Sequence, residues 1–360
     1  MRIASLPSPE NQSKVLVTLD SGIEKELWIE ANVPLAKGLD SWLYLMLPVC
    51  MMLKEDLQVD EDITKTAVDS FHKAQDQLLI KHPHFREIKL ISSTEPRATS
   101  REKPQGIGSF FSGGLDSTFT LETQEDITSV IGVWGFDIPL KNERHWNLTK
   151  ALLDKHSKAL NKDLILVSTN IRELSNGIIL WGRDYHGTAL AGIGNSLSNH
   201  LQKIYISGSH LEETKRWGQF PSLSKAFSNT YQEIQEHGVM PRAKKANLLG
   251  NLPRTTNIRI CYRNVSGMQN CGECLKCVRT RMEFDLVNAK YRPAGLERKP
   301  TSWELTKWKL NNGEYVFFLD SLNWAKENGF SGTLVPRVLV TLARIYSLPF
   351  MAVRKRQGLE

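Results

Sequence analysis

The sequence predicts an α/β protein: a doubly wound parallel sheet with an N-terminal α/β module and a helical C-terminal region. Two observations carry this prediction. After Gly106, short apolar runs typical of strands alternate with segments of helical periodicity, an alternation that indicates parallel βαβ units. The flanking segments follow other patterns, so we predict four parts: a module at 1–95, a linker at 96–105, a core domain at 106–298 and a helical region at 299–360.

The N-terminal module is predicted from local patterns. Residues 14–30 alternate apolar and polar side chains, which predicts a β-hairpin, and residues 62–80 carry apolar side chains at the spacing of one helix face. A further strand is predicted at 85–92. Residues 93–105 combine serine, proline and charge without periodicity, which predicts a linker or a long surface loop.

The core domain is predicted to contain four strands, at 107–112, 129–139, 163–169 and 203–209. In a doubly wound sheet, ligands bind outside the carboxyl ends of the strands. Small and polar residues follow these ends, among them Ser112–Ser117 and Asp137. We therefore expect them to line one pocket.

Composition limits the classes of protein to consider. The longest apolar run, Ser41–Leu53, is too short to cross a bilayer and contains a proline, and the N-terminus lacks the apolar core of a secretory signal. No membrane helix and a cytoplasmic location are expected. The net charge of +7 permits an anionic partner without requiring one, and the basic clusters at 242–247 and 353–357 are expected to be solvated surface, so nucleic acid is not strongly indicated.

The sequence SGGLDS, Ser112–Ser117, is the strongest local motif. It follows a predicted strand and should open a helix, where backbone amides and the helix dipole favour an anion. Gly113 and Gly114 permit close approach of phosphate oxygens, and Ser112 and Ser117 add hydroxyl groups. Asp116 would repel phosphate unless a cation lies between them, which predicts Mg²⁺. The alternative is an ordinary strand-to-helix turn in which these residues act as caps.

Four of the five cysteines form a second motif, C-x9-C-x2-C-x2-C, made of Cys261, Cys271, Cys274 and Cys277. Four thiolates are sufficient for tetrahedral zinc, and such a site stabilises the fold without an open position for substrate. An iron–sulfur cluster is the alternative, because the spacing also suits one. Disulfides are less expected in a cytoplasmic chain, and Cys50 is expected to be a buried small side chain.

SGGLDS resembles the SGGxDS signature of the PP-loop ATP pyrophosphatases, whose fold is the adenine nucleotide alpha hydrolase-like α/β fold. The resemblance implies ATP and Mg²⁺ as cofactors, cleavage between the α- and β-phosphates, and transfer of AMP to a carboxylate or carbonyl oxygen. It assigns catalytic roles to Asp116 and Ser117. Nucleotide binding falls to Ser112, Gly113, Gly114, Leu115, Asp116 and Ser117, with Asp137 added from the end of the next predicted strand.

The loop, the cysteine spacing and Arg279 in CVRT together resemble the 7-cyano-7-deazaguanine synthase (QueC) family over roughly residues 106–290. This implies an ATP-dependent ligase that adenylates 7-carboxy-7-deazaguanine and then forms a C–N bond with ammonia. The segment 207–223 lacks the family's YPDCR motif, and the chain has extra residues at both ends. In these respects the chain is more similar to the longer QueC-like proteins of bacterial antiphage systems, which implies a protein amine, and hence a partner protein, in place of ammonia.

Other candidate residues have weaker signals. Arg183, Asp184 and His186 precede the fourth core strand and either reach the pocket or cap a helix. After that strand, a loop either holds pyrophosphate and stacks on a purine or is simply solvated, and it contains His210, Lys215, Arg216 and Trp217. Two other functions stay open: a PP-loop enzyme that modifies tRNA, and a nucleotide-binding regulatory module without turnover. The sequence is compatible with an oligomer.

Overall fold

The computed structural model describes residues 1–98, 103–208, 218–261, 263, 265, 269–308, 310 and 312–356, without the side chains of 312, 313 and 347–356. The described chain divides into two compact units. The sheet unit comprises described residues of 1–112, 120–208 and 218–237. The helical unit comprises Gly113–Phe119 and the described residues from Gly238 onward. The SGGLDS motif thus crosses from one unit to the other after Ser112.

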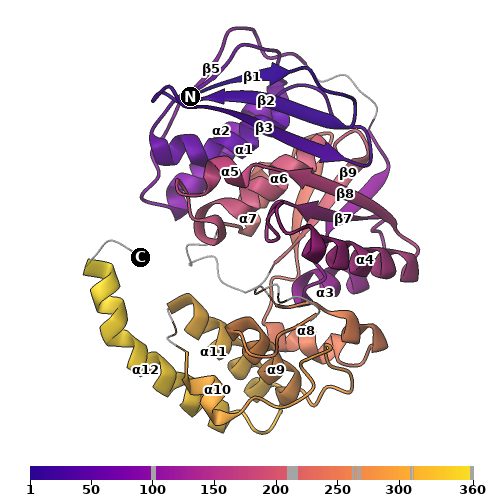
Figure 1. Cartoon of the computed structure of the whole chain (residues 1–360), viewed down its shortest axis with the longest axis vertical. Coiled ribbons are helices and arrows are strands. Elements are labelled where there is room, and N and C mark those ends of the chain that lie inside the picture. Colours follow the sequence, from indigo (N-terminus) through magenta and orange to yellow (C-terminus); the bar gives the residue numbers. More distant parts are fainter. Residues whose placement is uncertain are drawn as a thin grey trace. The chain divides into compact units, whose positions relative to one another are not determined.

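The sheet unit is built on one mixed sheet of ten described strands in the order β10-β9-β6-β7-β8-β3-β2-β1-β4-β5 (Figure 1). Five strands that follow residue 105 run parallel to one another, namely β6 (Gly106–Phe110), β7 (Ser129–Trp134), β8 (Asp163–Thr169), β9 (Leu201–Ser207) and β10 (Glu233–His237). The predicted fold class, an α/β protein on a largely parallel sheet with a helical C-terminal region, is confirmed.

The order of the parallel strands reverses at β6. Its successors β7 and β8 lie on one side of it, while β9 and β10 lie on the other. In open α/β sheets such a reversal creates a crevice at the carboxyl ends of the two strands concerned, and ligands bind there. Phe111 and Ser112 follow β6 directly, so the SGGLDS motif starts at this switch point.

The N-terminal strands continue the same sheet. The hairpin predicted at 14–30 is present, because β2 (Gln12–Thr18) pairs antiparallel with β3 (Glu24–Ala31). On its other edge β3 pairs antiparallel with β8, with Ile29 opposite Thr169. The sheet is completed by β1 (Arg2–Leu6), β4 (Leu57–Val59) and β5 (Leu90–Ser92). The segment predicted as an N-terminal module therefore shares its sheet with the core domain.

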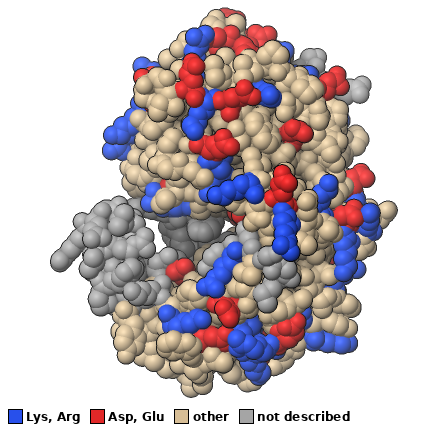
Figure 2. Space-filling model, viewed as in Figure 1, with Lys and Arg blue, Asp and Glu red and all other residues tan. Residues whose placement is uncertain are grey.

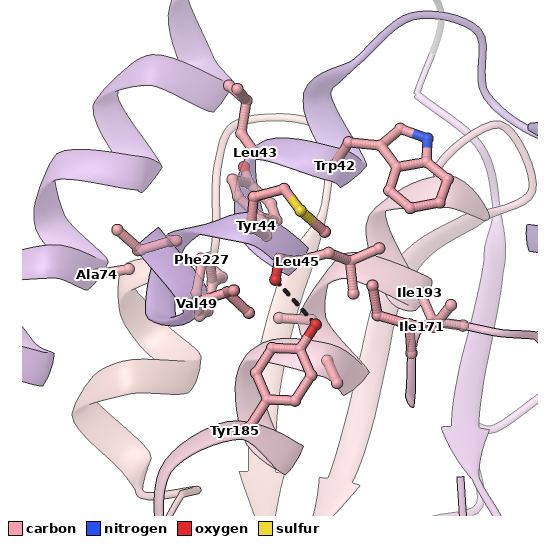
Figure 3. Packing of buried hydrophobic residues seen from close by; sticks show 14 of the residues in the cluster. Trp42, Leu43, Tyr44, Leu45, Val49, Ala74, Ile171, Tyr185, Ile193 and Phe227 are labelled. Atoms are coloured by element: carbon pink, nitrogen blue, oxygen red, sulfur yellow. Dashed lines mark hydrogen bonds between the residues drawn. The ribbon is translucent and has the colours of Figure 1, made fainter. Parts of the chain in front are cut away.

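The apolar run of the N-terminal segment forms a buried helix, α1 (Asp40–Leu53). A helix that is apolar on all sides must be covered on all sides, and α1 packs against α2 (Lys65–Lys81) and α6 (His186–Ser196). Figure 3 shows this core, where Tyr44 of α1 lies beside Phe227 and the Tyr185 hydroxyl donates to the Leu45 carbonyl at 2.8 Å. Among the described residues, no helix is long and apolar enough to cross a membrane.

The remaining helices fall into two groups. Those wholly or mainly in the sheet unit are α4 (Glu143–Ala159), α5 (Arg172–Ser175), the π-helix η1 (Trp181–Tyr185) and α7 (Pro221–Ala226). The helical unit contains α8 (Arg242–Leu249), the 3-10 helix η2 (Pro253–Asn257), α9 (Leu275–Leu286), α10 (Ser302–Thr306), α11 (Asn312–Glu327) and α12 (Leu334–Arg356). Helix α3 (Leu115–Thr123) starts in the helical unit, continues into the sheet unit after Phe119, and carries the second half of SGGLDS. On the face shown in Figure 2, Lys and Arg side chains are interspersed with Asp and Glu.

Candidate functional site

The SGGLDS motif forms a strand–turn–helix junction. Gly113 has a φ of +74°, in the left-handed region that favours glycine, and α3 begins two residues later. The Thr118 amide donates to the Gly114 carbonyl at 2.9 Å, and the Ser117 hydroxyl donates to the same oxygen at 3.2 Å. The turn therefore places Asp116 in the first turn of α3, where the helix dipole favours an acidic side chain.

Two basic side chains of α8 bind the Asp116 carboxylate. Lys245 Nζ lies 2.6 Å from Asp116 Oδ1, and Arg242 Nη1 donates a hydrogen bond to Asp116 Oδ2. Arg242 and Lys245 are three positions apart, so a helix places them on one face. Each carboxylate oxygen of Asp116 thus has its own cationic partner, all within the helical unit.

The sequence-based expectation that the basic cluster at 242–247 is solvated surface was wrong for these two residues. Lys245 is fully buried and Arg242 is 6% exposed, whereas the intervening Lys244 is exposed. Burial of a charge is costly unless a partner compensates it, and Asp116 supplies that partner. A signal was present in the sequence: Arg242, Ala246 and Leu249 have the spacing of one buried helix face, which a solvated cluster does not require.

A second carboxylate, Glu283 of α9, holds Arg242 from the other side. Arg242 Nε donates to Glu283 Oε1 at 3.3 Å and Oε2 at 3.2 Å, and Arg242 Nη2 donates to the Thr280 hydroxyl at 3.2 Å. Glu283 is fully buried and also accepts from the Ser321 hydroxyl at 3.2 Å. These contacts fix the guanidinium in position, because it is hydrogen-bonded to side chains of two helices, α3 and α9.

Arg279, a predicted site residue, belongs to the same cluster. Its Nε lies 3.6 Å from Glu283 Oε1, and its guanidinium stacks over the Phe317 ring at 4.5 Å from the centroid. Burial lowers the pKa of Arg279 to about 10, and the charge of Arg242 adds to this effect. Of the predicted site residues, the structure therefore brings Asp116 and Arg279 into one buried group of charges.

The electrostatics of Asp116 favour its ionised form. Burial opposes ionisation, yet the charges of Arg242 and Lys245 hold the pKa of Asp116 below its ordinary value. For Lys245 the effect of burial is larger than the effect of its ion pair: burial lowers the pKa of Lys245, although the charge of Asp116 raises it. The carboxylate is therefore the fixed charge of the cluster over the whole neutral range of pH.

The four cysteines of the second motif converge in the helical unit. All four Sγ atoms lie within 4.8 Å of one another, with Cys271 Sγ and Cys274 Sγ at 3.9 Å and 3.4 Å from Cys277 Sγ. A tetrahedral zinc site with Zn–S bonds of about 2.3 Å separates its sulfurs by about 3.8 Å. All four are free thiols, and the hydrogen bond with Cys277 lowers the pKa of Cys274 to about 5. The cluster can bind a metal ion such as zinc.

Asn270 holds the loop that carries the first cysteine against the loop that carries the others. Its Oδ1 accepts from the Ile260 amide at 2.6 Å and the Cys261 amide at 3.1 Å, while Nδ2 donates to the Ile258 and Ala294 carbonyls at 2.9 Å each. All four side-chain bonds of this amide are thus used within the helical unit. The thiols are therefore held in place by protein contacts as well as by any bound ion.

The cysteine cluster and the SGGLDS loop share one apolar core. Leu115 and Phe119 pack in the same buried cluster as Cys261, Cys274 and Cys277. In addition, the amide of Arg259, two residues before Cys261, donates to the Gly113 carbonyl at 2.7 Å. Helix α9 starts directly after Cys274 and carries Arg279 and Glu283. A metal ion at the cysteines would therefore stabilise the elements that hold Asp116.

Other predicted site residues belong to the sheet unit. Ser112 and Asp137 are exposed at the ends of β6 and β7. Burial, as the largest effect, lowers the pKa of His186 to about 4, which leaves its imidazole neutral at neutral pH. Arg183 binds its neighbour Asp184 in a bidentate ion pair, with Nε–Oδ1 at 2.7 Å and Nη2–Oδ2 at 2.8 Å. The predictions at His210, Lys215, Arg216 and Trp217 lie outside the described residues.

Comparison of the chain with models of known protein families, with curated proteins and with solved structures finds no match. The candidate site is therefore defined by its own geometry. It consists of the glycine-rich turn that carries Asp116 and the buried basic side chains that bind this aspartate, all of them in the helical unit. Turns of this kind, with cations beside them, bind phosphate groups in proteins.

Proposed function

We propose that this chain is an ATP-dependent enzyme that adenylates a carboxylate, releases pyrophosphate, and then forms a C–N bond. The SGGLDS motif and its resemblance to the PP-loop ATP pyrophosphatases support the use of ATP. One observation carries the proposal furthest: Arg242 and Lys245 are buried beside Asp116, at the loop where the resemblance requires a phosphate site. A loop that served only as a turn would not require two buried cations.

In this proposal the described residues divide the work of binding the triphosphate. The amides around Gly113 and Gly114 contact phosphate oxygens, and Lys245 and Arg242 compensate the charge of the departing pyrophosphate. Both oxygens of Asp116 are already engaged by cations, so its role is to position Arg242 and Lys245. Mg²⁺ would enter with the phosphates of ATP, which are its usual ligands.

The chemistry then follows two displacements. A substrate carboxylate oxygen attacks the α-phosphorus, the bond to the β-phosphate breaks, and pyrophosphate leaves. An amine next attacks the acyl carbon, the C–O bond to AMP breaks, and the amine nitrogen loses a proton as the amide forms. The carboxylate is proposed to be that of 7-carboxy-7-deazaguanine, and the amine to be ammonia or a protein amine, because the resemblance to the QueC family implies both. In the second case the partner is a protein.

The cysteine cluster has a structural role in this scheme. The four thiols fit zinc, and when bound the ion would cross-link Cys261 to the start of α9. Four protein ligands leave no position for substrate. The ion would therefore act through the loop and α9, which share its apolar core.

The alternative of a tRNA-thiolating PP-loop enzyme has less support. Such an enzyme needs a reactive thiol, and outside the cysteine cluster the chain has Cys50 alone. Cys50 is fully buried in α1, and burial raises the pKa of its thiol. A buried thiol with a raised pKa is a poor nucleophile.

The test is incubation of the full chain with ATP, Mg²⁺ and 7-carboxy-7-deazaguanine, with and without ammonium, followed by measurement of pyrophosphate and mass spectrometry of the products. We expect pyrophosphate to be released only when the carboxylate is present. Release without ammonium, together with an acyl-adenylate, would show that adenylation precedes the attack of the amine. Absence of release with this substrate and with other carboxylated deazaguanines, under any amine supply, would refute the proposal.

A further inference from the structure

A second group of metal-ligating side chains lies in the sheet unit, where no sequence motif indicated a metal site. It consists of His82, His84 and Asp184, whose ligand atoms all lie within 4.8 Å of one another. Asp184 Oδ1 is 3.4 Å from His82 Nδ1 and 3.2 Å from His84 Nε2. A tetrahedral ion with bonds of about 2.0–2.1 Å to nitrogen and oxygen separates its ligand atoms by about 3.4 Å. The two distances from Asp184 Oδ1 are thus already at coordination spacing.

The fold fixes these ligands from two distant parts of the chain. His82 terminates α2, with its amide bonded to the Leu78 carbonyl at 2.8 Å, and His84 follows after one proline. Asp184 lies in η1, a π-helical turn, and such turns are frequent at functional sites. Its neighbour Tyr185 is fully buried, and its hydroxyl bonds to Leu45 of α1 (Figure 3). The carboxylate therefore has a rigid support.

We propose that His82, His84 and Asp184 bind a divalent transition-metal ion of the zinc or ferrous class. Two imidazoles and one carboxylate are the ligands that such ions prefer, whereas Mg²⁺ and Ca²⁺ prefer oxygen alone. His82 and Asp184 are fully buried, and the His84 side chain is 27% exposed, so an ion can enter from the His84 side. Three protein ligands leave a coordination position for water or another small ligand.

Arg183 is the competitor of the ion in this site. Its guanidinium binds both oxygens of Asp184, and its Nη2 lies 3.4 Å from His84 Nε2. A bound dication would repel this charge, and the Arg183 side chain, 30% exposed, can move into solvent. Metal binding and the Arg183–Asp184 ion pair therefore compete for Asp184, so removal of Arg183 should increase the affinity for the ion.

The experiment titrates Co²⁺ into the full chain after its cysteine cluster has been filled with zinc. A histidine–carboxylate site gives weak visible bands without the intense thiolate-to-cobalt absorption of a cysteine site. We expect one Co²⁺ per chain with such bands, loss of this ion in His84→Gln and Asp184→Asn, and retention in His72→Gln, which changes an exposed histidine of α2. Arg183→Ala should bind Co²⁺ about tenfold more tightly, because the competing charge is gone.

Two results would overturn the proposal. The first is that neither the wild-type protein nor Arg183→Ala binds cobalt at any site other than thiolate sites. The other is a non-thiolate cobalt site that survives both His84→Gln and Asp184→Asn. Circular dichroism shows whether each variant is folded. If Asp184→Asn fails to fold, the result for His84→Gln alone decides, because His84 is the most exposed of the three ligands and its replacement disturbs the core least.

Discussion

Lys245 Nζ lies 2.6 Å from Asp116 Oδ1, although the two residues are 129 positions apart in the chain. Lys245 is fully buried, so this contact is an ion pair of the interior. Such a pair contributes little net stability compared with apolar residues of the same size, since desolvation offsets the attraction. The proposed function explains its location beside a glycine-rich turn by the binding of an anionic ligand.

Replacement of Lys245 by methionine tests this explanation. Methionine keeps the length of the side chain and removes the charge, so we expect pyrophosphate release to fall by at least about 100-fold, as when a charged contact to a phosphoryl group is lost. Folding should survive, because Arg242 still pairs with Asp116. Lys244→Met is the matched control: Lys244 is adjacent and exposed, and its loss should change the rate less than about twofold. Equal rates in the two variants would contradict a role for Lys245.

Replacement of Asp116 by asparagine should reduce both activity and stability. The variant leaves Arg242 and Lys245 without the carboxylate that compensates them, and loss of one partner of a buried pair costs about 3–5 kcal/mol. We expect urea unfolding to show a loss of this order and the steady-state assay to show no pyrophosphate. Glu143→Gln, an exposed carboxylate at the start of α4, should behave as wild type. Full activity in Asp116→Asn would remove Asp116 from the mechanism.

The cysteine cluster should control the loop through their shared core. Removal of a bound metal by a chelator, or Cys274→Ser, should lower the melting temperature and abolish pyrophosphate release, because Cys261 and α9 would lose their cross-link and the SGGLDS loop shares their apolar core. Cys50→Ala removes a thiol far from that cluster in sequence and should keep the metal content and the activity. Elemental analysis with calorimetry provides the measurement, and a metal-free chain of unchanged stability and activity would contradict the coupling.

His186 should make stability depend on pH in the acid range. Burial lowers its pKa to about 4 in the folded chain, against about 6.5 unfolded, so the unfolded state binds a proton first as pH falls. Stability is therefore fully present above about pH 6.5 and declines towards pH 4, by about 2 kcal/mol after allowance for partial exposure. Urea unfolding from pH 7 to pH 4.5 measures this slope, and His186→Gln should reduce it. An unchanged slope in the variant would show that His186 titrates normally.

Local patterns were sufficient to predict the fold class and the two motifs. Alternating strands and helices determine a parallel sheet, and the SGGLDS turn and the cysteine spacing each lie within a short stretch of sequence. The pairing of β3 with β8 could not be predicted, because it joins residues about 140 positions apart and depends on which sheet edge is open. The four-part division of the chain was drawn without knowledge of that pairing.

The buried charges were missed for a related reason. The sequence RAKKAN has the composition of a solvated surface, and only the partner carboxylates, Asp116 and Glu283, make burial of Arg242 and Lys245 possible. The same holds for His82 and His84, whose significance depends on Asp184, a residue from another part of the chain. Burial of paired charges can be recognised only when the fold is known, because the two partners come from distant parts of the sequence.

The most direct test of the central claim uses 7-carboxy-7-deazaguanine labelled with ¹⁸O in its carboxylate. If this chain adenylates the carboxylate and an amine then displaces AMP, one carboxylate oxygen must leave with AMP. We predict equimolar pyrophosphate and AMP in the presence of ammonium or a protein amine, with one ¹⁸O in the AMP phosphate by mass spectrometry. AMP without the label, or phosphate in place of pyrophosphate, would contradict the proposed adenylation.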